Sequence, residues 1–90
     1  MNERRIVLSE HVRVEAMRRG IAEETILAVA AQPDRREIVR PGREVRQSKI
    51  AFPPEDKIYV VRVFVDLGEE EDVVVTVYRT SKIAKYWREP

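Results

Sequence analysis

The chain contains no cysteine, only three glycines and a single histidine. Without cysteine it forms neither a disulfide nor a thiolate metal site. It also lacks a glycine-rich phosphate loop, a Ser–His–Asp order and the ligand spacing of a zinc site. These absences exclude several common enzyme classes, and we expect neither a metal ion nor a cofactor.

Long apolar runs are absent as well. No run approaches the roughly 20 residues of a membrane span. The N-terminal residues 1–5 are followed by only three apolar residues, too few for the core of a signal peptide. We therefore expect a cytoplasmic protein with no membrane partner. Its 90 residues, 43% hydrophobic and 37% charged, predict one folded domain over residues 1–90.

The net charge of +1 hides an uneven distribution of charge. Residues 35–49 hold six cations and two carboxylates, whereas residues 66–72 hold five carboxylates and no cation. Most of the cations are arginine, which suits bidentate contacts with phosphate, so one face of the domain is a candidate polyanion surface. The alternative is that heat adaptation favours charged residues. The acidic segment lacks the spacing of a calcium loop and is typical of a solvated hairpin tip.

The first third of the sequence predicts two helices. Ser9 is a good N-cap for a helix over Glu10–Arg19, and Gly20 is suited to the left-handed position that ends it. A second helix is predicted over Glu23–Gln32, with acidic residues in its first turn and an almost wholly apolar body. The short link between the two predicts a helical hairpin. The preceding Ile6–Leu8 is either a short edge strand or an apolar lead-in.

The rest of the chain predicts strands joined by short turns, which favour antiparallel pairing. A short helix over Ser81–Trp87 closes the chain. The predicted fold is a two-layer α+β domain in which the helical hairpin packs on a four-stranded, mainly antiparallel sheet. The four predicted strands are Glu37–Arg40, Glu44–Ala51, Ile58–Asp66 and Val73–Thr80.

Several short motifs resemble those of a family of small bacterial and archaeal domains of unknown function. The opening of that family is similar to His11, Met17 and the Arg-Gly-Ile of residues 19–21, and a later turn resembles Gln32–Asp34. Its closing strand is similar to Val75–Lys82. These domains are often compared with RelE- and BrnT-like toxins. One departure is Glu15, where the family often has a basic residue.

The resemblance implies a RelE/BrnT-like fold and the activity of a toxin of a toxin–antitoxin system. Such toxins are metal-independent endoribonucleases that act on mRNA and are masked by a cognate antitoxin protein. In their reaction a 2′-hydroxyl or a water attacks a phosphate. The chemistry needs cations for the developing charge and a group that moves a proton.

Four residues are candidates for the catalytic role. Arg79 ends the last strand, where it would stabilise phosphate charge, and Lys82 follows it closely. His11 titrates near neutrality and has Glu15 one helical turn away, which suits an oriented base. Arg62 is the one cation inside an otherwise apolar strand. Each has a structural alternative: an ion pair, a solvated helix face or an i, i+4 surface contact.

Four further residues are candidates for RNA contacts. Arg46 and Lys49 lie on one predicted strand, and Lys85 and Tyr86 lie on the last helix. Cations that follow a backbone and an aromatic ring that stacks on a base are typical of single-strand binding. The alternative is a solvated helix end whose cations complement the helix dipole.

A second hypothesis uses the same residues without catalysis. The sheet and its basic rim would then bind RNA or a protein without cleaving it. This hypothesis is favoured because a single histidine leaves few groups for acid–base catalysis. A homodimer through the edge of the Glu37–Arg40 strand, or through the last helix, is a further expectation, since open sheet edges invite pairing.

Overall fold

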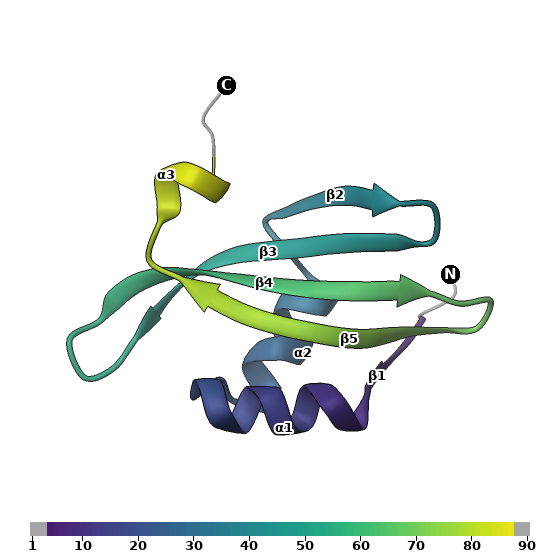
Figure 1. Cartoon of the computed structure of the whole chain (residues 1–90), viewed down its shortest axis with the longest axis horizontal. Helices are drawn as coiled ribbons and strands as arrows, with labels where there is room; N and C mark the ends of the chain where they lie inside the picture. The colour runs from purple at the N-terminus through teal and green to yellow at the C-terminus, as the bar shows by residue number, and fades with distance from the viewer. Residues whose placement is uncertain (1–3, 88–90) are drawn as a thin grey trace.

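The computed structural model describes residues 4–87, which form one five-stranded sheet and three helices (Figure 1). This confirms the α+β class. In chain order the elements are β1 (Arg5–Leu8), α1 (Glu10–Arg19), α2 (Glu23–Ala31), β2 (Arg35–Arg40), β3 (Arg43–Phe52), β4 (Lys57–Leu67), β5 (Glu71–Thr80) and α3 (Ile83–Tyr86).

The predicted count of four strands was wrong, because β1 adds a fifth. The strand order across the sheet is β1-β5-β4-β3-β2, and every neighbouring pair is antiparallel except β1 with β5. The parallel register places Leu8 beside Val74. Strand β1 has only four residues. Because strands are usually longer, the sequence did not distinguish a short strand from an apolar lead-in.

Helix α1 has the predicted bounds. The hydroxyl of Ser9 accepts a hydrogen bond from the backbone N–H of Val12 at 3.1 Å, which caps the helix N-terminus. At the other end Gly20 takes a left-handed conformation with φ of 66°, and its N–H donates to the carbonyls of Ala16 and Met17. A glycine is favoured here because other residues reach this region at a steric cost.

The other elements differ from the prediction at their ends. Helix α2 ends at Ala31, one residue early, and each of the four predicted strands gains residues at one or both ends. Helix α3 is shorter, because Lys82 is not helical (φ −83°, ψ 66°) and its backbone N–H donates to the hydroxyl of Thr80. Local hydrogen bonds of this kind compete with the first turn of a helix.

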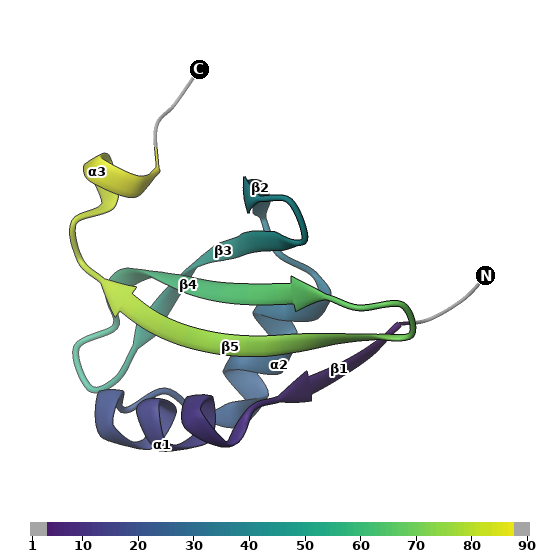
Figure 2. The ribbon, with the colours of Figure 1, turned by 45° about the vertical axis from the view of Figure 1, so that its right-hand side comes forward.

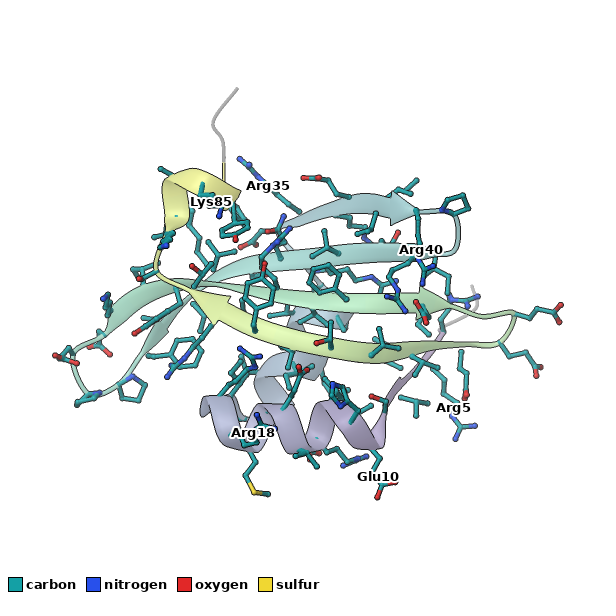
Figure 3. The ribbon with its side chains drawn as sticks, in the orientation of Figure 1. Arg5, Glu10, Arg18, Arg35, Arg40 and Lys85 are labelled. Carbon is teal, nitrogen blue, oxygen red and sulfur yellow. The ribbon has the colours of Figure 1, made fainter. Side chains whose placement is uncertain are left out.

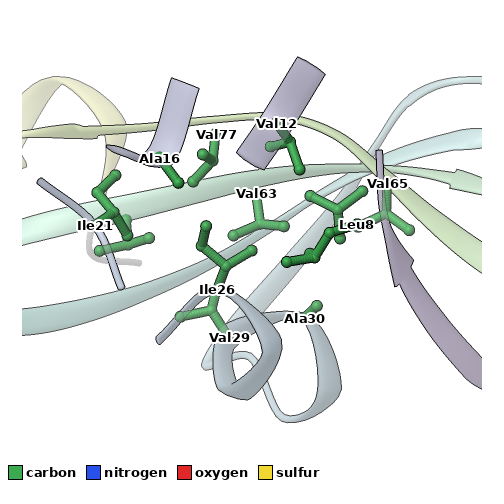
Figure 4. Close-up of a cluster of buried hydrophobic side chains, with 12 residues drawn as sticks. Leu8, Val12, Ala16, Ile21, Ile26, Val29, Ala30, Val63, Val65 and Val77 are labelled. Atoms are coloured by element: carbon green, nitrogen blue, oxygen red, sulfur yellow. The ribbon is translucent and has the colours of Figure 1, made fainter. Parts of the chain in front are cut away.

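Helices α1 and α2 cover one face of the sheet, and the core lies between the two layers (Figure 2). Because side chains alternate along a strand, Val61, Val63 and Val65 of β4 all point to the helices. They meet Val12 of α1 and Ile26 of α2 (Figure 4). The other face of the sheet, here called the open face, lies away from α1 and α2. Within residues 4–87 no helix has the length and apolar character needed to cross a membrane.

Candidate functional site

The open face carries a group of aromatic and cationic side chains. The alternation that buries Val61 and Val63 places Arg62 and Phe64 of β4 on the open face. Tyr78 of β5 is the cross-strand partner of Arg62. The rings of Phe64 and Tyr78 stack with their centroids 6.1 Å apart and 23° between their planes. Strands β4 and β5 therefore carry a pair of stacked aromatic rings beside a cation.

Arg62 is fixed by both hydrogen bonds and rings. Its Nε donates to Oε1 of Gln47 at 2.8 Å, and its Nη1 donates to the hydroxyl of Tyr78. The guanidinium carbon lies 4.5 Å from the ring centroid of Tyr86, 5.4 Å from that of Phe64 and 5.6 Å from that of Tyr78. Each cation–π contact contributes about 0.5–2 kcal/mol, so the charge is held in place before any ligand arrives.

The short helix α3 adds Lys85 and Tyr86 to this group on the open face of the sheet. Tyr86 meets Tyr78 edge to face with centroids 6.2 Å apart, and the ammonium of Lys85 lies 5.3 Å from the Tyr86 ring. Trp87, which is 9% exposed, has Arg35 and Lys49 at 4.3 and 5.0 Å from its ring centroid. Figure 3 shows Arg35 of β2 and Lys85 of α3 at the same end of the sheet. We name Arg62, Phe64, Tyr78, Lys85 and Tyr86 the open-face cluster.

The electrostatics of the cluster act on Tyr86. Hydrogen bonds with the hydroxyl of Tyr78 and with Lys85 lower the pKa of the Tyr86 phenol below its ordinary value of 10.0. Burial opposes this shift, and the charges of Lys85 and Arg62 add to it, so that the net effect is a lowered pKa. Arg62 donates to the hydroxyl of Tyr78, and the ring of Tyr78 in turn contacts the ring of Tyr86. Together these interactions favour the phenolate form of Tyr86.

Four of the eight predicted site residues lie together here. Arg62, Lys85 and Tyr86 belong to the open-face cluster, and Lys49 lies beside it against Trp87. Lys82 lies in the link between β5 and α3 with an exposed side chain. The other three predicted residues, Arg79, His11 and Arg46, lie away from the open-face cluster.

Arg79 points to the helix-covered face, since its cross-strand partner is the core residue Val61. Its guanidinium carbon lies 4.3 Å from the ring centroid of Phe52 and 4.6 Å from that of Tyr59. A side chain added at Gly20 would stand 3.6 Å from Nη2 of Arg79. Arg79 thus joins the end of α1 to the corner of the sheet, where a cation complements the helix dipole.

His11 lies on α1 with most of its side chain exposed, and its Nε2 is 3.5 Å from Oε2 of Glu15. The other carboxylate oxygen of Glu15 accepts from the hydroxyl of Thr76 at 2.6 Å and from the backbone N–H of Val77 at 3.1 Å. The His11–Glu15 pair predicted from spacing is present, but Glu15 is engaged with the edge of β5.

Arg46 is buried, with a side chain that is 5% exposed. It donates to Glu44 at 2.7 Å, to the carbonyl of Ala30 at 2.7 Å and to Asp72 at 3.1 Å. Asp72 also binds Arg4, at 2.8 Å. With its guanidinium enclosed under α2, Arg46 is not accessible to RNA.

The sequence prediction missed Phe64, Tyr78, Gln47 and Trp87. The first two could have been found, because they occupy the same face as Arg62 in a period of two along their strands. Gln47 and Trp87 were not identifiable in this way. Gln47 reaches Arg62 because of the register between β3 and β4. Trp87 contacts Arg35 because of the path that the chain takes through α3.

Among residues 4–87, no three histidine, aspartate or glutamate side chains gather closely enough to hold a metal ion. The cluster offers cations and rings, which suit an anionic ligand with stacked planar groups. Comparison of the chain with known protein families, with curated proteins and with solved structures finds no match.

Proposed function

We propose that the chain binds single-stranded RNA across the open face of its sheet. The observation that carries the proposal is the guanidinium of Arg62, held between the rings of Phe64, Tyr78 and Tyr86. Aromatic rings stack on bases, and each stacked base contributes about 1–3 kcal/mol. Arg62 and Lys85 would meet the phosphates. We also propose a cytoplasmic location, where RNA would be available as the ligand.

Fluorescence anisotropy of a short labelled RNA tests this proposal. Replacing Arg62→Gln should weaken binding by about tenfold or more, because one phosphate contact and its fixed geometry are lost. Arg18→Gln is the matched control, since it removes the same charge from an exposed position on α1. Equal losses in the two variants would contradict a defined site and indicate general charge attraction. Circular dichroism would confirm that both variants are folded.

A second candidate function, cleavage of the bound RNA without a metal ion, is supported by Tyr86. With its lowered pKa, the Tyr86 phenolate is a candidate base for the proton of an RNA 2′-hydroxyl. The 2′-oxygen would then attack the phosphorus, and Arg62 would stabilise the charge on the phosphate oxygens. The bond to the 5′-oxygen breaks, and Lys85 returns a proton to that leaving group. The products are a 2′,3′-cyclic phosphate and a 5′-hydroxyl.

The sequence resemblance to RelE- and BrnT-like toxins supports the same candidate. In that case the fold is of the RelE/BrnT type, mRNA is the substrate, and a cognate antitoxin masks the open face. Incubation with RNA in EDTA tests cleavage directly. A DNA strand of the same sequence, which lacks the 2′-hydroxyl, should bind and stay intact. Cleavage of this DNA would contradict the mechanism.

A further inference from the structure

Strand β2 forms one edge of the sheet and pairs with β3 alone (Figure 2). Its outer side has no partner strand among residues 4–87. The outer backbone N–H and C=O groups of such a strand are a template on which another strand can pair. At the middle of this edge Ile38 is 78% exposed and Val39 is 50% exposed. The edge therefore combines a template for pairing with apolar side chains that reach solvent.

The register of β2 against β3 determines which side chains of the edge share a face. Glu37 lies opposite Val45, and Arg40 lies opposite Arg43. Val45 and Arg43 are two positions apart on β3, so they point to the same face. The register shift in β2 therefore brings Glu37 and Arg40 to one face, although they are three positions apart in the chain. Val45 is the cross-strand partner of Phe64, so this face is the open face.

The charges of Glu37 and Arg40 are exposed, and neither takes part in an ion pair within residues 4–87. A partner strand that satisfies both must present a cation opposite Glu37 and a carboxylate opposite Arg40. A second copy of β2, running antiparallel, presents these two charges in that order.

An antiparallel second copy can pair with β2 about a two-fold axis between Ile38 and Val39. This register sets Glu37 of each copy opposite Arg40 of the other, and the exposed apolar residues meet at the axis. Opposite charges directly across a strand pair stabilise it, and here they meet twice. An axis on Glu37 would set that carboxylate opposite its own copy. An axis on Ile38 would set Arg36 opposite Arg40, whose side chain points to the other face.

We propose that the chain forms a homodimer in which two β2 edges pair antiparallel about the axis between Ile38 and Val39. The sheets of the two copies become one continuous sheet, and both open faces lie on the same side of it. The inference gives the dimer expected from the sequence a defined register. It goes beyond RNA binding and does not rest on it. Because an edge of six residues makes a small interface, the Kd should be on the order of 0.1 mM.

Sedimentation equilibrium of the full chain, from about 10 μM to about 1 mM, measures the dimer in the absence of RNA. Either charge reversal, Glu37→Arg or Arg40→Glu, should weaken the dimer by about tenfold or more, because two favourable pairs become two repulsive ones. Glu55→Arg is the matched control, since it makes the same reversal in the exposed turn between β3 and β4 and should leave the dimer unchanged. Circular dichroism would confirm that the variants are folded.

A one-to-one mixture of Glu37→Arg and Arg40→Glu tests the register itself. In the heterodimer, positions 37 and 40 again carry opposite charges across both pairs, so association should return to about the wild-type strength. A mixture of Glu55→Arg and Arg40→Glu has the same net charges but keeps one like-charged pair, so it should associate more weakly. In the wild type, the backbone amide shifts of residues 35–40 should depend on protein concentration.

Four results would overturn the inference. A wild-type chain that stays monomeric over the whole range would exclude the dimer. Charge reversals that weaken association no more than Glu55→Arg does would place the contact on another surface. A mixture of Glu37→Arg and Arg40→Glu that associates no better than either variant alone would exclude this register. Concentration-dependent shifts in α3 instead of residues 35–40 would place the dimer at the last helix. Because no RNA is present, each of these failures is distinguishable from failure of the proposed function.

Discussion

The carboxylate of Glu15 accepts a backbone hydrogen bond from the edge of β5, as a neighbouring strand would. Its Oε1 accepts from the backbone N–H of Val77, which lies beyond the last β1–β5 pair, Leu8 with Val74. The same oxygen accepts from the hydroxyl of Thr76. Strand β1 covers the first part of the β5 edge, and Glu15 of α1 covers the part that follows. The backbone N–H of Val77 therefore has an acceptor that it would otherwise lack.

Replacing Glu15→Ala should lower the free energy of unfolding by about 1–3 kcal/mol, because the N–H of Val77 and the hydroxyl of Thr76 are left without their acceptor. Urea denaturation measures the change. Arg18→Ala on the same helix removes an exposed side chain and should have little effect. Equal effects of the two substitutions would show that Glu15 acts through helix propensity alone.

The stability should fall in acid in a way that depends on Glu15 and Asp72. Burial raises the pKa of Glu15, but hydrogen bonds from Thr76 and Val77 outweigh it and hold the pKa below the ordinary 4.5. Burial likewise raises the pKa of Asp72, and its arginine partners hold it below 3.8.

Because both pKa values are lower in the folded state, the unfolded chain binds more protons in acid. Their contribution is complete above the ordinary values and is lost as the pH falls through the folded values. Urea denaturation at a series of pH values should show the stability gap between wild type and Glu15→Gln closing in that range. A gap that stays constant with pH would contradict the assignment.

The buried ion pair of Arg46 and Asp72 should be far more costly to break than a surface pair. Arg46→Met leaves the charge of Asp72 buried with one partner fewer, and should cost about 3–5 kcal/mol. Arg43→Met breaks the half-buried pair with Asp66 and should cost much less, because both side chains of that pair still reach solvent. Thermal denaturation measures both, and equal losses would show that the network under α2 is solvated.

Arg79 should affect stability and not RNA binding. Arg79→Gln removes the contacts with Phe52 and Tyr59, which together contribute about 1–2 kcal/mol, and loosens the end of α1. Its RNA affinity at a temperature where the variant is folded should equal that of wild type. A loss of affinity as large as that of Arg62→Gln would mean that RNA also reaches the helix-covered side of the sheet.

The sequence predicted the helices better than the sheet. Ser9 and Gly20 mark the ends of α1 because capping is local chemistry. Arg62 was identifiable as a member of the candidate site, since a cation in an apolar strand is unusual. Arg46 misled the prediction for the opposite reason: its burial depends on Asp72, 26 positions away, and on a carbonyl at the end of α2. Such long-range pairs follow from strand register, which local patterns do not contain.

Tyr86→Phe separates the two candidate functions of the open-face cluster. It removes the hydroxyl and keeps the ring that lies over Arg62. Since stacking needs the ring alone, RNA affinity should stay within about threefold of wild type. Tyr86→Leu removes both and should weaken binding by about tenfold or more, because an aromatic surface is lost.

If Tyr86 is the base, cleavage in EDTA should be lost in Tyr86→Phe although the RNA is still bound. The wild-type rate should rise with pH through the lowered pKa of Tyr86, because the base acts in its deprotonated form. The Lys85→Met variant should cleave more slowly, because the acid that protonates the leaving group is lost, and its remaining rate should rise at higher pH, since one of the groups that lower the pKa of Tyr86 is gone. A Tyr86→Phe variant that cleaves at the wild-type rate would leave binding as the function of the cluster and assign Tyr86 to stacking alone.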